Sequence, residues 1–210
     1  MKNKFSENYQ NLIKTYADFH NYGNTFVGKK DEVFHQKAEN IFYGKSLRHF
    51  FQPIKQVIDL TKSKSLIDFG CGKAKFYFNK IKIKEIEYKN VIEYWNIQDY
   101  FLYDPGVDIF STYPNKKMDG IICIDVVEHM PPEDVNNFIE DIFKLAKKFV
   151  FIVIACYPAW KNLPDGRNMH LSIKNPREWE GIISKFKFKY PNISPYVICS
   201  TSREEFVAAS

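Results

Sequence analysis

The sequence lacks any uninterrupted apolar run of about 18 residues, the length that a membrane-spanning helix needs. Residues 1–8 also lack the apolar stretch of a signal peptide. Cysteine is scarce, and its four copies form no C-x-x-C pair: Cys71, Cys123, Cys156 and Cys199. We therefore expect neither a membrane span nor a disulfide framework, and we predict a reduced, cytoplasmic protein.

A dense stripe of positive charge is also missing. The 30 basic residues are interspersed with 25 acidic ones, which leaves a net charge of +5. A nucleic-acid footprint is expected to be denser, and residues 80–84, where lysine alternates with isoleucine, are typical of a solvated face. We predict no specific nucleic-acid partner and no membrane partner. The sequence does not indicate an oligomeric state.

The first third of the chain carries no chemical motif, but its apolar residues recur at helical spacing. The spacing predicts helices within residues 5–16, 34–42 and 47–58. We interpret residues 1–60 as an N-terminal helical cap. Residues 42–46 have two interpretations, packing against the rest of the fold or forming the wall of a ligand pocket.

From Ser65 onward, short apolar runs alternate with amphipathic segments, which predicts a parallel sheet with crossover helices. The predicted strands are 65–69, 101–104, 119–125, 149–155, 186–190 and 196–201, and the predicted helices are 73–83, 132–148 and 175–185. The last two strands suggest an antiparallel pair at the sheet edge. Residues 61–210 are thus predicted to form one compact α/β domain with a doubly wound, mostly parallel sheet.

Three predicted strands end in residues suited to ligand binding, because ligands of open α/β sheets bind at the carboxyl ends of the strands. The first strand leads into Asp68-Phe69-Gly70-Cys71-Gly72, where glycine permits close backbone approach or positive φ. The second ends in Asp104, which either accepts the hydroxyls of a ribose or belongs to an Asp-Pro-Gly turn. The third ends in Asp125.

As an ordered set, the glycine-rich run, Asp104 and the sequence Asp-Val-Val-Glu-His at 125–129 resemble the motifs of class I S-adenosylmethionine (SAM)-dependent methyltransferases. The resemblance covers residues 60–201 and implies a Rossmann-like fold with SAM as the cofactor. Ala74 replaces the third glycine. Asp104 lies farther from the glycines than the usual spacing of about 20 residues. We therefore predict an insertion around 88–98, with Glu93 and Asp99 as alternatives to Asp104.

The resemblance also implies which residues bind the cofactor. In its pattern, the amino-acid and ribose end of SAM contacts the first strand and its loop, the ribose hydroxyls contact the second acid, and the methionine side contacts the third strand end. The corresponding residues are Asp68, Gly70 and Gly72, then Asp104, then Asp125 and Val126.

Residues 163–171 leave the end of a buried strand and are expected to overhang the same edge of the sheet. Arg167 and Asn168 are candidate substrate residues, because a guanidinium binds phosphate or carboxylate and an amide holds a polar acceptor. The alternative is an ordinary exposed polar loop. This stretch resembles a loop found in a subset of bacterial methyltransferases associated with surface-polysaccharide or phage genes.

Two histidines are candidate catalytic bases, His129 and His170, because the ordinary histidine pKa lies near working pH. Either can instead be structural. The pair Glu128-His129 also raises a divalent-metal alternative, but two ligands are too few for a metal site, so we predict no metal.

We predict a SAM-dependent methyltransferase that O-methylates a small polar acceptor, such as a sugar, a nucleotide-sugar or a phosphorylated precursor of a surface polysaccharide. Aromatic residues in the N-terminal helices leave a quinone-like acceptor open. The alternatives are an RNA or protein methyltransferase, or a partner subunit with the SAM fold but no catalysis.

Overall fold

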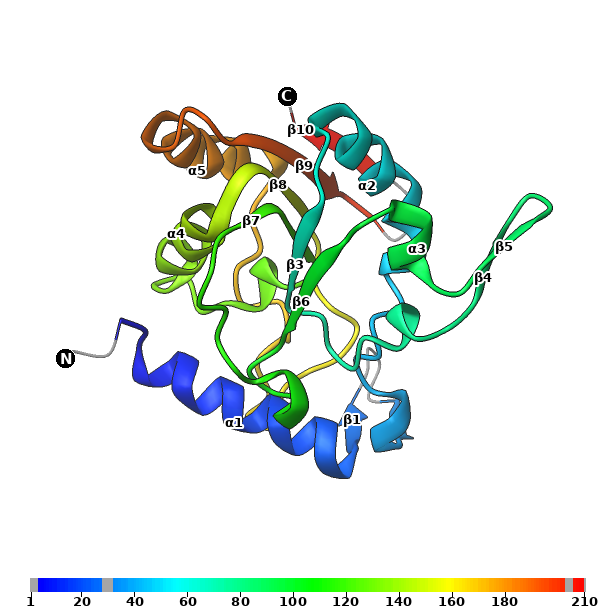
Figure 1. Cartoon of the computed structure of the whole chain (residues 1–210). Coiled ribbons are helices and arrows are strands. Elements are labelled where there is room, and N and C mark those ends of the chain that lie inside the picture. Colours follow the sequence, from blue (N-terminus) through cyan, green and yellow to red (C-terminus); the bar gives the residue numbers. More distant parts are fainter. Residues whose placement is uncertain (1–3, 28–31, 203–205, 210) are drawn as a thin grey trace.

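A six-stranded sheet forms the centre of the computed structural model, which describes residues 4–27, 32–202 and 206–209 (Figure 1). The strand order is β10-β9-β8-β7-β3-β6. The strands are β3 (Ser65–Phe69), β6 (Asp99–Tyr103), β7 (Met118–Ile124), β8 (Ala146–Ala155), β9 (Ser194–Ser200) and β10 (Phe206–Ala209). Only β10 pairs antiparallel with its neighbour in this sheet. The predicted Rossmann-like fold with an antiparallel C-terminal edge strand is confirmed.

Helices cover both faces of the sheet (Figure 1). Residues of α4 (Val135–Leu145) and α5 (Pro176–Lys189) form one hydrophobic core, and those of α2 (Leu47–Thr61) and α3 (Val91–Trp95) form the other. Strand β8 serves both, because Val150, Ile152 and Ile154 belong to the first core. The intervening Phe149, Phe151 and Val153 belong to the second. Burial on both faces explains why this strand is apolar throughout.

Helix α1 (Glu7–Tyr22) takes a different position, beside the carboxyl ends of the parallel strands (Figure 1). Its first turn is capped by the Ser6 side chain, which accepts a hydrogen bond from the Tyr9 amide at 3.1 Å. Both ends of α1 are held to the body: the Ser6 amide donates to Asp134 at 2.9 Å, and Lys73 Nζ donates to the His20 carbonyl at 2.8 Å. The helix is therefore fixed over the strand ends.

The predicted helix at 34–42 is wrong. The chain instead forms a hairpin of β1 (Asn24–Val27) and β2 (Val33–Gln36), followed by a 3-10 turn at Ala38–Asn40. Phe26 and Phe34 are register partners in this hairpin, and their rings stack at 5.6 Å. Cross-strand pairing of aromatic side chains stabilises the hairpin over the helix that the spacing suggested.

The predicted helix at 73–83 is also wrong. Only a 3-10 turn at Lys75–Tyr77 follows the glycine loop, and then a hairpin of β4 (Ile81–Ile83) and β5 (Ile86–Tyr88). The Ile-Lys-Ile alternation has the period of a strand, and Lys84 makes the turn with a φ of 53°. The crossover to β6 is made by α3, which lies within the predicted insertion at 88–98.

The predicted strand at 186–190 is wrong as well, because α5 continues to Lys189. Trp179, Ile183 and Phe186 lie four and three residues apart and form one buried helical stripe. The antiparallel edge pair is therefore β9 with β10. The division of the chain at residue 60 stays a prediction. Across the described ranges, no helix combines the length and apolarity that crossing a membrane requires.

Helical geometry at the end of α5 predicts opposite outcomes for two nearby phenylalanines. Phe186 is 8% exposed and Phe188 is 91% exposed, whereas a strand would place both on one face. We expect Phe186→Ala to lower the free energy of unfolding by about 3–5 kcal/mol. Phe188→Ala should change it by less than about 0.5 kcal/mol. Urea unfolding measures both, and equal losses would contradict the helical register.

Candidate active site

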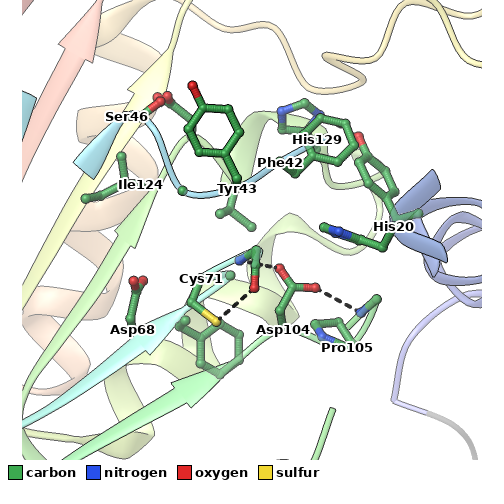
Figure 2. A pocket seen from close by; sticks show the side chains of 18 of the residues that line it. His20, Phe42, Tyr43, Ser46, Asp68, Cys71, Asp104, Pro105, Ile124 and His129 are labelled. Atoms are coloured by element: carbon green, nitrogen blue, oxygen red, sulfur yellow. Dashed lines mark hydrogen bonds between the residues drawn. The ribbon is translucent and has the colours of Figure 1, made fainter. Parts of the chain in front are cut away.

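A cavity of about 310 Å³ lies where α1 meets the carboxyl ends of β3, β6 and β7 (Figure 2). All six residues predicted to bind the cofactor line it: Asp68, Gly70, Gly72, Asp104, Asp125 and Val126. The facing wall comes from α1, with Tyr9, Leu12, Ile13, Tyr16 and His20. Residues 42–47 complete the enclosure, so 42–46 form a pocket wall, the second of their two interpretations.

The backbone amides of the glycine loop are bound to the protein itself. The Gly70 and Cys71 amides both donate to the Tyr103 carbonyl, at 2.7 and 3.1 Å. The Gly72 amide donates to Asp104 Oδ2 at 2.9 Å. The loop is thus shaped by β6 and by the acid that follows it, and Asp104 fixes the loop as well as lining the cavity.

Glycine is required at both positions of the loop by close contact as well as by φ. Gly70 has a φ of 93°, and a Cβ atom there would lie 2.4 Å from Val126 Cγ2. Gly72 has a φ of 56°, and its Cβ would lie 2.1 Å from the carbonyl oxygen of Phe42. A side chain at either position is incompatible with the present packing.

The cavity lining includes three carboxyl groups from three strand ends, and Figure 2 labels two of them, Asp68 and Asp104. Burial raises the pKa of Asp68 to about 7, although the Tyr77 hydroxyl donates to it at 2.7 Å and partly offsets that shift. Burial also raises the pKa of Asp104, against the effect of its hydrogen bonds from Gly106 and Gly72. The pKa of Asp125 is likewise raised by burial. Such a cluster favours a ligand that brings positive charge or hydroxyl donors.

The two alternatives to Asp104 lie away from the cavity. Glu93 accepts a hydrogen bond from the Lys89 amide at 2.5 Å at the start of α3. Asp99 begins β6, at the opposite end of the strand from the cavity, and pairs with Lys116 at 2.7 Å. Among the three candidates, the structure brings only Asp104 to the glycine loop.

His129 contacts α1 at the far side of the cavity. Its Nδ1 lies 2.7 Å from the Tyr16 hydroxyl, and its ring packs edge-on against that of His170 at 4.8 Å. Burial lowers the pKa of His129 to about 3, and the positive field of His170 adds to this shift. His129 is therefore neutral at physiological pH, with a lone pair on one of its ring nitrogens.

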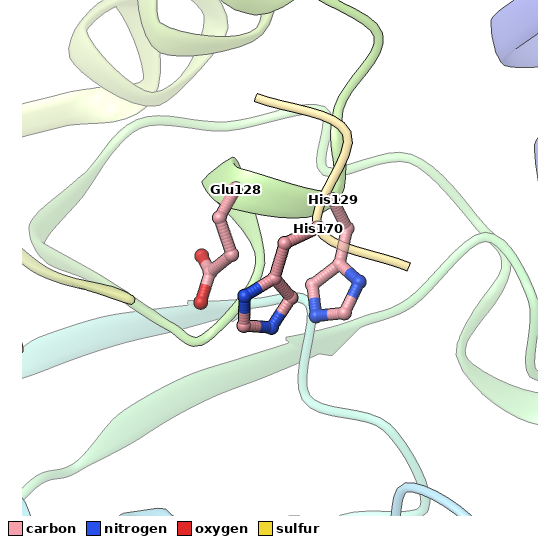
Figure 3. A group of neighbouring side chains, drawn as sticks. All are labelled: Glu128, His129 and His170. Carbon is pink, nitrogen blue, oxygen red and sulfur yellow. The ribbon is translucent and has the colours of Figure 1, made fainter. Parts of the chain in front are cut away.

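His170 does not line the cavity but supports His129. Its Nδ1 lies 2.6 Å from the Tyr157 carbonyl, which assigns the proton to that nitrogen. Burial lowers its pKa. Glu128 lies beside the two rings (Figure 3). A carboxylate oxygen of Glu128 and one ring nitrogen from each histidine all lie within 4.8 Å of one another.

Glu128 is fully buried and differs from an ordinary surface acid. Its Oε1 accepts the Ala155 amide at 3.0 Å, while Oε2 has no hydrogen-bond partner among the described residues. Burial raises the pKa of Glu128 well above its usual value, and the negative charge of Asp125 adds to this shift. With His170 as a third neighbour, the geometry is closer to a metal site than the sequence suggested. The absence of a metal stays a prediction.

The two predicted substrate residues lie outside the cavity lining. Arg167 pairs with Asp165 at 2.7 Å and donates to Asn8 at 3.1 Å on the exposed surface. The Asn168 amide is used by the loop backbone, accepting from the Ala159 and His170 amides and donating to the Ala159 carbonyl. These contacts shape the loop that carries His170. A substrate role for either residue stays a prediction.

Tyr16 and His20 line the cavity but were not singled out from the sequence. Both lie on α1, four residues apart and so on one face of the helix. In the sequence, the only available signal was a tyrosine and a histidine at helical spacing on an otherwise apolar stripe. That pattern is equally typical of a packed core.

The fold and the cavity define a class of protein, the α/β enzymes that bind a nucleoside-containing cofactor at the carboxyl ends of parallel strands. Within that class, the chain belongs to a methyltransferase domain family, whose family model matches residues 40–190. It is a class I SAM-dependent methyltransferase, and its cofactor is SAM. No curated protein and no solved structure matches the chain.

The close approach at Gly72 generates a prediction with a matched control. Gly72→Ala should destabilise the protein by more than the cost of positive φ alone, about 1–2 kcal/mol, because the Phe42 carbonyl must also move. Gly166 has a φ of 86° with no atom within 4 Å of an added Cβ, so Gly166→Ala isolates the φ cost. Urea unfolding compares the two variants. Equal losses would show that the Phe42 contact is unimportant.

Proposed function

We propose that the methyltransferase binds SAM in the cavity between the glycine loop and α1 and transfers its methyl group to a hydroxyl of a small acceptor. The observation that carries the proposal is the enclosure of the strand ends by α1, which leaves a pocket of about 310 Å³. Pockets for small molecules and cofactors span about 300–1,000 Å³. An open groove would favour a polymeric acceptor, whereas a pocket of this size favours a small one.

The chemistry of the cavity suits the cofactor. SAM carries a sulfonium, an ammonium and two ribose hydroxyls, and the wall offers the carboxyl groups of Asp68, Asp104 and Asp125. In this arrangement Asp104 accepts the ribose hydroxyls, while Asp68 and Asp125 lie toward the cationic methionine end. Gly70 and Gly72 allow Val126 and the Phe42 carbonyl to approach the loop closely, and these contacts shape the cavity that takes the ligand. When bound, SAM supplies an electrophilic methyl group.

On the acceptor side, we propose that Tyr16 and His129 form a relay that removes the proton of the acceptor hydroxyl. In this relay His129 Nδ1 carries no proton, so the Tyr16 hydroxyl, 2.7 Å away, donates to it and keeps lone pairs for an acceptor hydroxyl. As that hydroxyl loses its proton to Tyr16, the tyrosine proton passes to Nδ1. A weak base suffices, because an alcohol oxygen becomes strongly acidic once it is methylated. His170 orients His129 in this scheme.

For the acceptor, we propose a sugar, a nucleotide-linked sugar or a phosphorylated precursor of a surface polysaccharide, methylated in the cytoplasm. Support comes from the likeness of residues 163–171 to the corresponding loop of bacterial methyltransferases of that kind. A second candidate is an aromatic, quinone-like acceptor. It is favoured by the apolar part of the wall, which includes Leu12, Ile13 and Phe42.

Methyl-labelled SAM distinguishes these acceptors. The enzyme is incubated with separate pools of sugars and nucleotide-sugars, of quinols, of RNA and of protein, and the labelled product is isolated. Label in the first pool, on oxygen, supports the proposal, and label in the quinol pool supports the second candidate. Label in RNA or protein alone would contradict both, and label in no pool would favour a non-catalytic partner subunit.

The placement of the cofactor is tested by binding of S-adenosylhomocysteine, the demethylated form of SAM. Because a hydrogen bond to a charged group contributes about 1.5–3 kcal/mol, we expect Asp104→Asn to weaken binding at least about tenfold by calorimetry. Asp99→Asn, at the opposite end of β6 from Asp104, should leave affinity unchanged. Wild-type affinity in the Asp104 variant would exclude its ribose role.

The relay predicts a separation of binding from turnover. Tyr16→Phe keeps the ring that packs against Phe42 at 5.3 Å but removes the hydroxyl. We expect kcat for the identified acceptor to fall about 10²-fold or more, with unchanged S-adenosylhomocysteine affinity. Tyr22→Phe, an exposed tyrosine on the same helix, should have wild-type kcat. Unchanged kcat in the Tyr16 variant would rule the relay out.

A further inference from the structure

His20, like Tyr16, is a polar residue of α1 that lines the cavity, and its side chain makes no hydrogen bond that would stabilise the fold among the described residues. It is 5% exposed and lines the cavity, where its ring extends between Phe42 and Asp104 (Figure 2). Its Nδ1 is buried and has no hydrogen-bond partner among the described residues. Leaving a buried polar atom unpaired costs free energy, so an imidazole without a partner at a cavity wall needs a hydrogen-bond partner, which a ligand can supply at the ring nitrogen that faces the cavity.

The position of His20 identifies the part of the ligand that it faces. A Cβ atom on Gly106 would lie 3.3 Å from His20 Cδ2 and 3.3 Å from Asp104 Oδ1, so the imidazole and the carboxylate flank the same small residue. The Phe42 ring holds the imidazole from the other side, with ring centroids 5.6 Å apart. His20 and the acid expected to accept the ribose hydroxyls therefore both border Gly106 at the cavity wall.

The two side chains complement each other as hydrogen-bonding groups. Each Asp104 oxygen already accepts one backbone amide, from Gly72 or Gly106, and retains a lone pair for a ribose hydroxyl. A hydroxyl that donates to Asp104 still needs a donor for its own oxygen. The neutral imidazole carries one N–H, and burial beside Lys73, which lowers the His20 pKa to about 4, keeps it neutral.

We propose that His20 binds the ribose of the nucleoside cofactor, donating a hydrogen bond to a hydroxyl whose hydrogen goes to Asp104. This inference rests on the proposed placement of SAM in the cavity. It makes α1 a part of the cofactor site, so that the ribose is held between the end of β6 and a helix from the N-terminal segment.

The test distinguishes a ligand-binding histidine from a structural one by two measurements, the affinity for the ligand and the stability of the protein without ligand. His20→Phe keeps an aromatic ring against Phe42 but removes both nitrogens. For S-adenosylhomocysteine, we expect Kd by calorimetry to rise about tenfold, while urea unfolding without ligand shows equal or greater stability, because an unpaired buried polar group has been removed. His35→Phe, at an exposed histidine of β2, should change neither quantity.

Two further measurements make the outcome decisive. His20→Gln retains an N–H donor and should keep Kd within about threefold of the wild type, and it also serves if His20→Phe fails to fold. A 2′- or 3′-deoxy analogue of S-adenosylhomocysteine should bind more weakly than the parent to the wild type, with a smaller difference in His20→Phe. An unchanged Kd for S-adenosylhomocysteine in His20→Phe overturns the inference. So does a deoxy analogue that loses the same affinity relative to the parent ligand in His20→Phe as in the wild type.

Failure of the cofactor placement gives a different result. If the wild type does not bind S-adenosylhomocysteine, or if Asp104→Asn binds it normally, the proposed site is wrong and the role of His20 falls with it. If Asp104→Asn loses affinity while His20→Phe does not, the site stands and only the role of His20 is excluded.

Discussion

The contact of Gly72 with the Phe42 carbonyl is the constraint on which the site depends. Because no side chain fits there, the glycine loop can lie directly beneath residues 42–47, and the Lys73 amide donates to the Phe42 carbonyl at 2.9 Å. On its other side the Gly72 amide is bound by Asp104. One residue without a side chain therefore joins three segments that are far apart in the chain, and the cavity is the space that they enclose.

Electrostatics follow from this enclosure. Acids gathered at three strand ends are buried together, and the pKa of each is raised, while burial lowers the pKa of the cavity histidines His20 and His129. A site that combines acids of raised pKa with neutral histidines is poorly matched to an anion. It is well matched to a cationic ligand with hydroxyl groups, because such a ligand stabilises the charged form of the acids. The same burial keeps His129 unprotonated.

Much of the sheet was predictable because its strands are locally distinctive. The apolar run of β8, which includes Phe149, Phe151 and Val153, has no helical alternative of comparable strength. The ends of the other predicted strands indicated Asp68, Asp104 and Asp125 as candidate site residues. Residues 34–42, 73–83 and 186–190 were mispredicted because a few apolar residues fit periods of 2 and 3.6 equally well, and tertiary packing decided between them. Tyr16 and His20 were missed for another reason: what distinguishes them is the strand ends they face, and no local pattern contains that information.

Helix α1 links the two halves of the reaction that the site supports. Tyr16 and His20 are one turn apart, so the helix rise of 1.5 Å per residue separates them by about 6 Å along the axis. One faces His129, and the other faces Asp104. The helix is fixed at its end by Lys73, which directly follows Gly72. Because the glycine loop and α1 are joined at this point, in the proposed reaction the loop on the cofactor side also influences the position of Tyr16 on the acceptor side. If SAM and the acceptor bind as proposed, one helix contributes to both of their sites and so helps to fix the alignment that in-line methyl transfer requires.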